Sequence, residues 1–206
     1  YYLALRYDFE RNAEAVIAAA AETLGAFPVF VKPCSQGSSV GVAKANNLLE
    51  LAEGLTEAFK LDTKVLVEEF IDGHEVECAV LGNLEPQAST VGEIAPTQEF
   101  YTFDAKYKDE SSRLYIPAHI TEEQIAAVRQ DAVRVYTALG CRGLSRVDFF
   151  VTHDSGEVVF NELNAIPGFT SISMYPKLME HEGLPVPQLI DRLIALALER
   201  KEKQHG

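Results

Sequence analysis

The chain has 206 residues, of which 47% are hydrophobic and 24% are charged, a composition that excludes disordered and collagen-like chains. Its formal net charge of −13 argues against a protein that coats polyanions, because non-specific nucleic-acid binding depends on clustered Lys and Arg. No apolar run approaches the roughly 20 residues that span a bilayer, and the first residues lack the basic segment of a signal peptide, so we expect a soluble, cytoplasmic protein without nucleic-acid or membrane partners.

The first 75 residues are expected to alternate between helices and buried strands. In chain order, the expected elements are a helix over 10–24, a strand over 27–33, a polar glycine loop over 35–41, a helix over 48–60 and a strand over 65–71. Gly25 ends the first helix, because glycine readily adopts the left-handed conformation found at helix ends. Asn46 or Asn47 caps the second helix.

The rest of the chain is expected to contain strands, helices and one long irregular segment. In chain order these are strands over 75–81 and 91–95, an irregular segment over 97–117, a helix over 121–140, strands over 143–151 and 157–163, and an amphipathic helix over 187–203. The irregular segment is polar and rich in aromatic residues. Loops of that length in compact domains are usually functional, so we expect a lid.

Two of the expected strands carry polar side chains at alternate positions. Arg146 and Asp148 share one strand face, Glu162 and Asn164 share another, and a hairpin would bring all four groups onto one surface. Carboxylate and amide oxygens are the ligands that Mg²⁺ prefers when it also binds phosphates. The alternative is a solvated strand face, but apolar neighbours such as Val147 favour a metal site.

Two glycine-containing segments suggest sites for anions. After Asn164 comes a proline–glycine turn with Gly168 and a cluster of hydroxyl residues, whose N–H and O–H groups could hold a carboxylate or an oxyanion. The loop over 35–41 has the small residues that expose backbone donors to phosphate, and Lys32 precedes it on a buried strand. The alternatives are an ordinary turn and a lysine that reaches solvent.

Five segments stand in an order and spacing typical of one family. They are residues 31–33, 37–41, 67–70, 143–148 and 161–170. Together they resemble the D-alanine–D-alanine ligases of the ATP-grasp superfamily, over about residues 24–198. The resemblance implies an α+β fold of two lobes with mainly antiparallel sheets that enclose ATP, with residues 1–75 as the central lobe and 76–206 as the C-terminal lobe.

The resemblance implies an ATP-dependent ligase that joins two D-alanines through an acyl phosphate, for peptidoglycan precursor synthesis. Its implied cofactors are ATP and two Mg²⁺ or Mn²⁺ ions, and its implied assembly is a homodimer. Members of the family also carry an N-terminal domain that orients the first D-alanine. We find no counterpart in this sequence and expect that such a domain is needed for activity.

The resemblance also assigns roles to single residues. Those that match metal ligands are Asp148, Glu162 and Asn164. Those that match nucleotide contacts are Lys32, Ser39, Glu68, Phe70, Ile71, Glu75, Lys106 and Phe150. Those that match groups stabilising the intermediate or closing the site are Arg146, Gly168, Ser38 and Tyr107. Those that match contacts to the second substrate are Ser173, Met174 and Asn164.

Three alternative functions stay open at the level of the sequence. The second substrate could be D-serine or D-lactate, although the lid sequence over 103–107 resembles the branch that uses D-alanine. The same metal and phosphate residues would serve another ATP-grasp ligase that acts on a different carboxylate and amine. The third alternative is a nucleotide-binding fragment without turnover.

Overall fold

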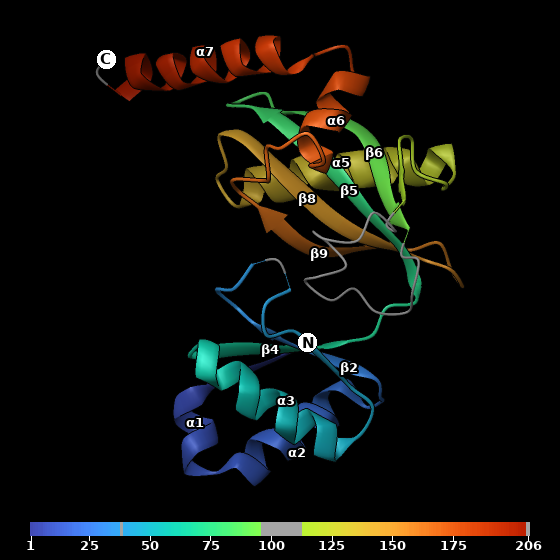
Figure 1. Cartoon of the computed structure of the whole chain (residues 1–206), viewed down its shortest axis with the longest axis vertical. Helices are drawn as coiled ribbons and strands as arrows, with labels where there is room; N and C mark the ends of the chain where they lie inside the picture. The colour runs from blue at the N-terminus through green and yellow to red at the C-terminus, as the bar shows by residue number, and fades with distance from the viewer. Residues whose placement is uncertain (38, 96–112, 205–206) are drawn as a thin grey trace. The chain divides into compact units, whose positions relative to one another are not determined.

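The computed structural model describes residues 1–37, 39–95 and 113–204 (Figure 1). The described chain divides into two compact units, of which the first ends at Ile71 and the second begins at Asp72. The second unit begins there because its central strand, β5, starts at Gly73. The division into functional lobes after residue 75 stays a prediction.

The first unit is an antiparallel sheet with helices on one side (Figure 1). Its strand order is β1 (Tyr2–Leu5), β4 (Lys64–Glu69), β2 (Val29–Pro33) and β3 (Ala43–Ala45). Its helices are α1 (Arg6–Arg11), α2 (Ala13–Leu24) and α3 (Leu48–Leu61). Alternate residues of the strands, with the apolar sides of α2 and α3, form one buried core.

The sequence predicted one continuous helix over 10–24, but the structure has two helices there. Helix α1 ends at Arg11, and Asn12 then caps α2, where its side-chain oxygen accepts a hydrogen bond from the backbone N–H of Ala15 at 3.1 Å. An asparagine side chain competes in this way with the backbone, which favours a cap over a helix interior. The short edge strands β1 and β3 were not expected from the sequence.

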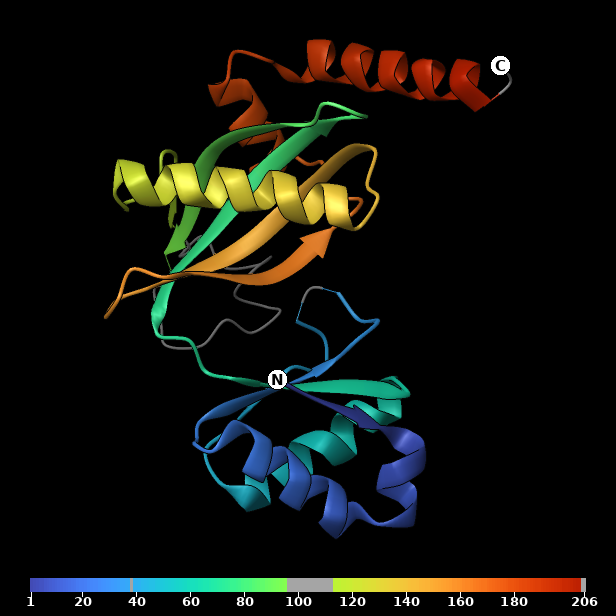
Figure 2. The ribbon, with the colours of Figure 1, turned by 180° about the vertical axis from the view of Figure 1, so that it is seen from behind.

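The second unit is a five-stranded antiparallel sheet covered on both faces (Figures 1 and 2). Its strand order is β7 (Arg113–Tyr115), β6 (Gln87–Ala95), β5 (Gly73–Gly82), β8 (Gly143–Thr152) and β9 (Val158–Asn164). Its helices are α5 (Glu122–Ala138), α6 (Met174–His181) and α7 (Val186–Gln204). Helix α5 covers one face and α6 covers part of the other.

Helix α5 begins as the sequence predicts. Thr121 and Gln124 form a complete capping box, in which each side chain accepts a hydrogen bond from the backbone N–H of the other residue. Near the other end of α5, the buried hydroxyl of Tyr136 donates to the carbonyl oxygen of Gly82 at 2.7 Å. The helix is therefore fixed to the sheet by its apolar face and by a buried hydrogen bond.

Helix α6 was not expected, and it packs on the sheet at a glycine. A Cβ atom at Gly92 would lie 2.6 Å from the sulfur of Met174 and 3.2 Å from Leu178, so a larger residue there would require these side chains to shift. Tyr175 and Leu178 are fully buried against Ala79 of β5. Burial of these side chains stabilises the short helix α6. The periodicity of the sequence gave little indication of this helix.

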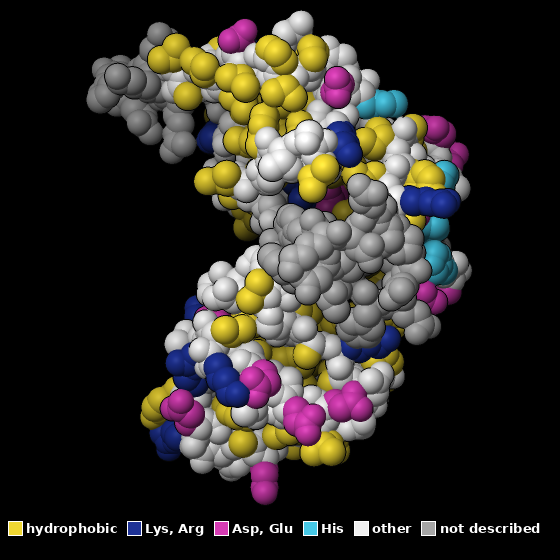
Figure 3. Space-filling view, viewed as in Figure 1, with side chains coloured by type: hydrophobic (Ala, Val, Ile, Leu, Met, Phe, Trp, Pro, Cys, Tyr) yellow, Lys and Arg dark blue, Asp and Glu magenta, His cyan; other side chains and the backbone are white. Residues whose placement is uncertain are grey.

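Helix α7 shows apolar side chains to solvent as well as to the sheet (Figure 3). The exposed ones recur at every fourth position, at Val186, Ile190, Ile194 and Leu198.

In the part of the chain that the structure describes, no helix combines the length and the apolar character needed to cross a membrane.

A buried carboxylate joins three segments of the second unit. Glu93 on β6 is 6% exposed, and its Oε1 lies 2.7 Å from Nδ1 of His74 on β5. Its Oε2 accepts a hydrogen bond from the backbone N–H of His119 at 2.9 Å, in the segment after β7. The ring of His119 lies against that of Tyr115, with 4.0 Å between the centroids.

Replacing Glu93 with Gln is expected to lower the free energy of unfolding at neutral pH by about 2 kcal/mol, the size of hydrogen bonds to a charged group. Burial raises the pKa of Glu93, but the hydrogen bonds from His74 and His119 outweigh it and hold the pKa below its usual value. Because the folded-state pKa is lowered, the stabilisation exists above a pH of about 4.3 and disappears as the pH falls below it.

Urea denaturation as a function of pH measures this difference. Glu85→Gln is the matched control, because Glu85 is an exposed carboxylate beside the same strand pair. A Glu93→Gln variant as stable as the wild type at pH 7 would contradict the interpretation.

Candidate active site

The antiparallel register of β8 and β9 gathers the four polar residues on one face, as the sequence predicts. Arg146 pairs with Asn164, and Asp148 pairs with Glu162. Arg146 donates two hydrogen bonds to the carboxylate of Asp148, from Nε at 2.8 Å and from Nη2 at 2.7 Å. The amide of Asn164 donates to Asp148 and to Glu162, both at 3.1 Å.

Strand β5 adds two more carboxylates to the same face. Glu77 pairs with Asp148 across β5 and β8, and its Oε2 lies 3.2 Å from Nε of Arg146. Glu75 pairs with Phe150, which lies two residues beyond Asp148 and therefore shares its face. Asp148 is 4% exposed and Glu77 is 3% exposed, so these charges lie in a largely dry environment.

The charges of this cluster do not balance. Burial raises the pKa of Asp148 above its usual value, Arg146 opposes the shift, and the carboxylates of Glu162 and Glu75 add to it. Burial lowers the pKa of Arg146, but Asp148, Glu77 and Glu162 outweigh it and raise the pKa. One guanidinium thus faces several carboxylates.

The donor chemistry of this cluster fits a hard divalent cation. Asp148, Glu162 and Asn164 offer oxygen atoms, and the excess negative charge around Arg146 would be offset by a cation. Among the described residues, no group of three His, Cys, Asp or Glu side chains has metal-binding spacing. The candidate set differs from such a group because its third member is an amide.

The segment after β9 leads directly into helix α6. A Cβ atom at Gly168 would lie 2.8 Å from the hydroxyl oxygen of Ser173, so the backbone and the hydroxyl approach closely there. The Ser173 oxygen accepts a hydrogen bond from the backbone N–H of Thr170 at 3.0 Å and does not cap α6. The N–H of Met174 belongs to the first turn of α6, where backbone donors have no partner within the helix.

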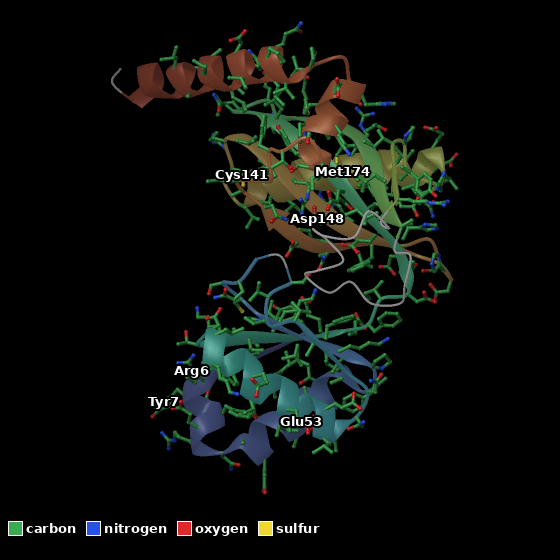
Figure 4. All side chains as sticks on the ribbon, in the orientation of Figure 1. Arg6, Tyr7, Glu53, Cys141, Asp148 and Met174 are labelled. Carbon is green, nitrogen blue, oxygen red and sulfur yellow. The ribbon has the colours of Figure 1, made fainter. Side chains whose placement is uncertain are left out.

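The cluster and this helix start lie on the same side of the second unit's sheet. Figure 4 shows Asp148 on the sheet and Met174 at the start of α6. Helix α6 covers the apolar part of this face, including Ala79 and Leu81, and the carboxylates occupy the rest. The opposite face contributes Val76, Val147 and other apolar side chains to the core under α5.

The sheet of the first unit carries a second group of candidate residues, on the face away from its helices. Phe30 on β2 lies opposite Lys44 on β3 and Glu68 on β4. The amine of Lys32 lies 2.6 Å from a carboxylate oxygen of Glu68. The ring centroids of Phe70 and Phe30 lie 6.2 Å apart. The Lys44 amine lies 4.6 Å from the ring centroid of Phe70. The face combines aromatic rings with charged groups.

The remaining expected site residues are only partly described. Ser39, in the glycine loop, has a φ of 60°, which is a strained backbone conformation for a residue other than glycine. Ile71 is the last residue of the first unit. Ser38, Lys106 and Tyr107 lie outside the described residues, as does most of the expected lid.

Sequence reasoning did not single out Glu77, Phe30 and Lys44. Glu77 lies two residues after Glu75, and Phe30 lies two residues before Lys32, so strand alternation was an available signal for both. Lys44 lies on a strand of three residues that sequence periodicity did not reveal.

Solved structures of ligases share this fold. The D-alanine-D-alanine ligase from Coxiella burnetii matches with a TM-score of 0.81 and 36% identity, over 99% of this chain and 53% of its own. The VanG D-Ala:D-Ser ligase from Enterococcus faecalis matches with a TM-score of 0.81 and 45% identity, over 94% of this chain and 55% of its own. The expected α+β, ATP-grasp fold class is confirmed.

Sequence comparison gives the same relationship. The D-alanine--D-alanine ligase of Chlorobium phaeovibrioides is 53% identical over 195 residues, which are 95% of this chain and 54% of that protein. The chain therefore spans about half the length of this relative. A family model described as the D-ala D-ala ligase C-terminus matches residues 1–195. The chain belongs to this family, as the resemblance of its motifs predicted.

Replacing Arg146 with Met is expected to lower the free energy of unfolding by about 3 kcal/mol, because it leaves buried carboxylates without their cation. Millimolar Mg²⁺ should raise the melting temperature of this variant more than that of the wild type, since the ion would take over part of the charge balance. Thermal unfolding with and without Mg²⁺ measures both effects.

The matched control is Arg142→Met, because Arg142 is an exposed arginine just before β8. An Arg146→Met variant that Mg²⁺ stabilises no more than the wild type would count against a cation site in this cluster.

Proposed function

We propose that this chain is the ATP- and metal-binding part of a ligase that joins two D-alanines into D-alanyl-D-alanine, for peptidoglycan precursor synthesis. The observation that carries the proposal is the cluster of Arg146, Asp148, Glu162 and Asn164, in a chain of the D-ala D-ala ligase family. ATP would phosphorylate the carboxylate of one D-alanine, and the amine of the second would displace phosphate from the acyl phosphate.

Nucleotide-binding residues are proposed in each unit by itself. In the first unit, Glu68, Phe70 and Ile71 would face adenine, and Lys32 and Ser39 would contact the phosphates. The ion pair between Lys32 and Glu68 supports a role for Lys32 in holding an anion. In the second unit, Glu75 would contact ribose, and Phe150 shares its strand face. Lys106 would neutralise phosphate charge.

The metal-binding residues are proposed to be Asp148, Glu162 and Asn164, with two Mg²⁺ or Mn²⁺ ions. The ions would polarise the phosphoryl oxygens and offset their charge during transfer. Arg146 is held by Asp148 in a fixed orientation, from which its guanidinium would stabilise the tetrahedral intermediate together with the N–H of Gly168.

The second substrate is proposed to bind at the start of α6. The Ser173 hydroxyl and the Met174 N–H would hold its carboxylate, which the unpaired donors of a first helical turn favour. Asn164 would contribute from β9. Ser38 and Tyr107 would form a hydrogen-bonded network that closes the site.

The first D-alanine is proposed to be oriented by a domain corresponding to the half of the relatives that this chain does not match. We also propose that the enzyme acts in the cytoplasm, as a homodimer.

A second candidate is a D-alanine–D-serine ligase, which the match to the VanG D-Ala:D-Ser ligase supports. The ATP and metal residues proposed above would serve either function. Competition between D-alanine and D-serine for the second position distinguishes them, through the identity of the dipeptide formed.

Turnover tests the proposed function, measured on the protein in the full length that its relatives have. With Mg-ATP and D-alanine, phosphate and D-alanyl-D-alanine should form in equal amounts. Phosphate release that does not depend on D-alanine would contradict the proposal.

Removing a metal ligand should abolish most of this turnover. Asp148→Ala and Glu162→Ala are each expected to lower the rate by at least about 100-fold, because even residues that only orient metal ligands contribute roughly 10- to 100-fold. Asp154→Ala is the matched control, since Asp154 is an exposed carboxylate in the turn of the same hairpin. Near-normal rates in both ligand variants would reject the metal assignment.

A further inference from the structure

The glycine loop that follows β2 is held by a residue at the end of α3. The backbone N–H of Ser35 donates to Oδ2 of Asp62 at 2.6 Å. Oδ1 of Asp62 accepts from the backbone N–H groups of Thr63 at 2.6 Å and Lys64 at 3.2 Å. One carboxylate therefore joins the start of the loop to the turn between α3 and β4.

The same turn contacts the loop at other points. The side-chain amide of Gln36 lies 3.5 Å from the carbonyl oxygen of Leu61, and the N–H of Cys34 donates to the carbonyl of Lys64 at 3.0 Å. At the far end of the loop, a Cβ atom at Gly41 would collide with Cδ1 of Leu61, so the loop passes directly over this side chain.

The turn itself is anchored from its other side. Arg6, the first residue of α1, donates from Nη2 to the carbonyl oxygen of Asp62 at 2.8 Å and from its backbone N–H to the carbonyl of Thr63 at 2.9 Å. Helix α3, which leads into the turn, is fixed by the buried Leu51 and Leu55. The loop is thus attached to a rigid support.

A carboxylate beside a loop for phosphates needs a physical reason, because like charges repel. The hydroxyl and the N–H of Ser35, with the N–H groups of Lys64 and Thr63, outweigh burial and lower the pKa of Asp62 to about 2. Asp62 stays ionised at neutral pH, and its charge is directed to backbone donors of the loop and turn. The strained φ of Ser39 also requires a loop that its surroundings hold in place.

We propose that Asp62 is a positioning residue for ATP, which fixes the described residues of the glycine loop, 35–37 and 39–41, so that their backbone N–H groups are already oriented for phosphate. This inference rests on the proposed function of the loop. A loop ordered before binding loses less conformational freedom when the ligand arrives, and so binds more tightly.

The experiment measures the dissociation constant of Mg-ATP and backbone hydrogen exchange on the same variants. Asp62→Asn is expected to raise the dissociation constant about tenfold, because the amide cannot accept the full set of hydrogen bonds. The increase should be the same from pH 6 to pH 9, since Asp62 does not titrate there. Ser35→Ala removes only the hydroxyl hydrogen bond and should have a smaller effect.

Hydrogen exchange separates positioning from folding. In Asp62→Asn, the amides of residues 34–37 should exchange faster, while those of Val31 and Val67 in the sheet keep their protection. Glu57→Gln is the matched control, because Glu57 is an exposed carboxylate on the same helix, paired with Lys60, and should change neither measurement.

Each outcome bears on one proposal or on both. Wild-type protein that does not bind Mg-ATP would overturn the proposed function and this inference with it. Wild-type protein that binds, with Asp62→Asn binding equally well, would overturn only the inference. Loss of protection at Val31 and Val67 would also overturn it, because Asp62 would then support the fold of the unit.

Discussion

Burial of several carboxylates on one sheet face is the constraint on which the second unit depends. The antiparallel register sets Glu77, Asp148 and Glu162 side by side across three strands, and two of them are almost inaccessible to solvent. Such charges persist only where cations and hydrogen-bond donors offset them, which Arg146 and Asn164 do in part. The excess of buried negative charge therefore both limits the stability of the sheet and favours the binding of a cation.

The centre of the candidate site could be predicted from the sequence because strand periodicity is local. Alternation along two neighbouring strands was enough to place Arg146, Asp148, Glu162 and Asn164 together. The contribution of Glu77 could not be derived in the same way, because the pairing of β5 with β8 joins residues far apart in the chain. The chemical roles of these side chains depend on bound ligands and stay predictions.

For the fold, the α+β class and the family were predicted correctly, and the misses have local causes. Asn12 was read as a helical residue, but its side chain caps the following helix. Helix α6 is short, contains Pro176 and is stabilised mainly by the burial of Tyr175 and Leu178. Tertiary packing of this kind overrides helix propensity and cannot be read from periodicity.

The contact of Met174 with Gly92 affects how this sequence can change during evolution. The side chain of Met174 belongs to the core, while its backbone begins the helix that follows the Gly168 turn. A change of volume under α6 is therefore expected to displace the turn as well, whereas a change under α5 acts on the core of the opposite sheet face. Apolar substitutions should therefore accumulate more readily on the α5 face than on the α6 face, where the packing and the turn must change together.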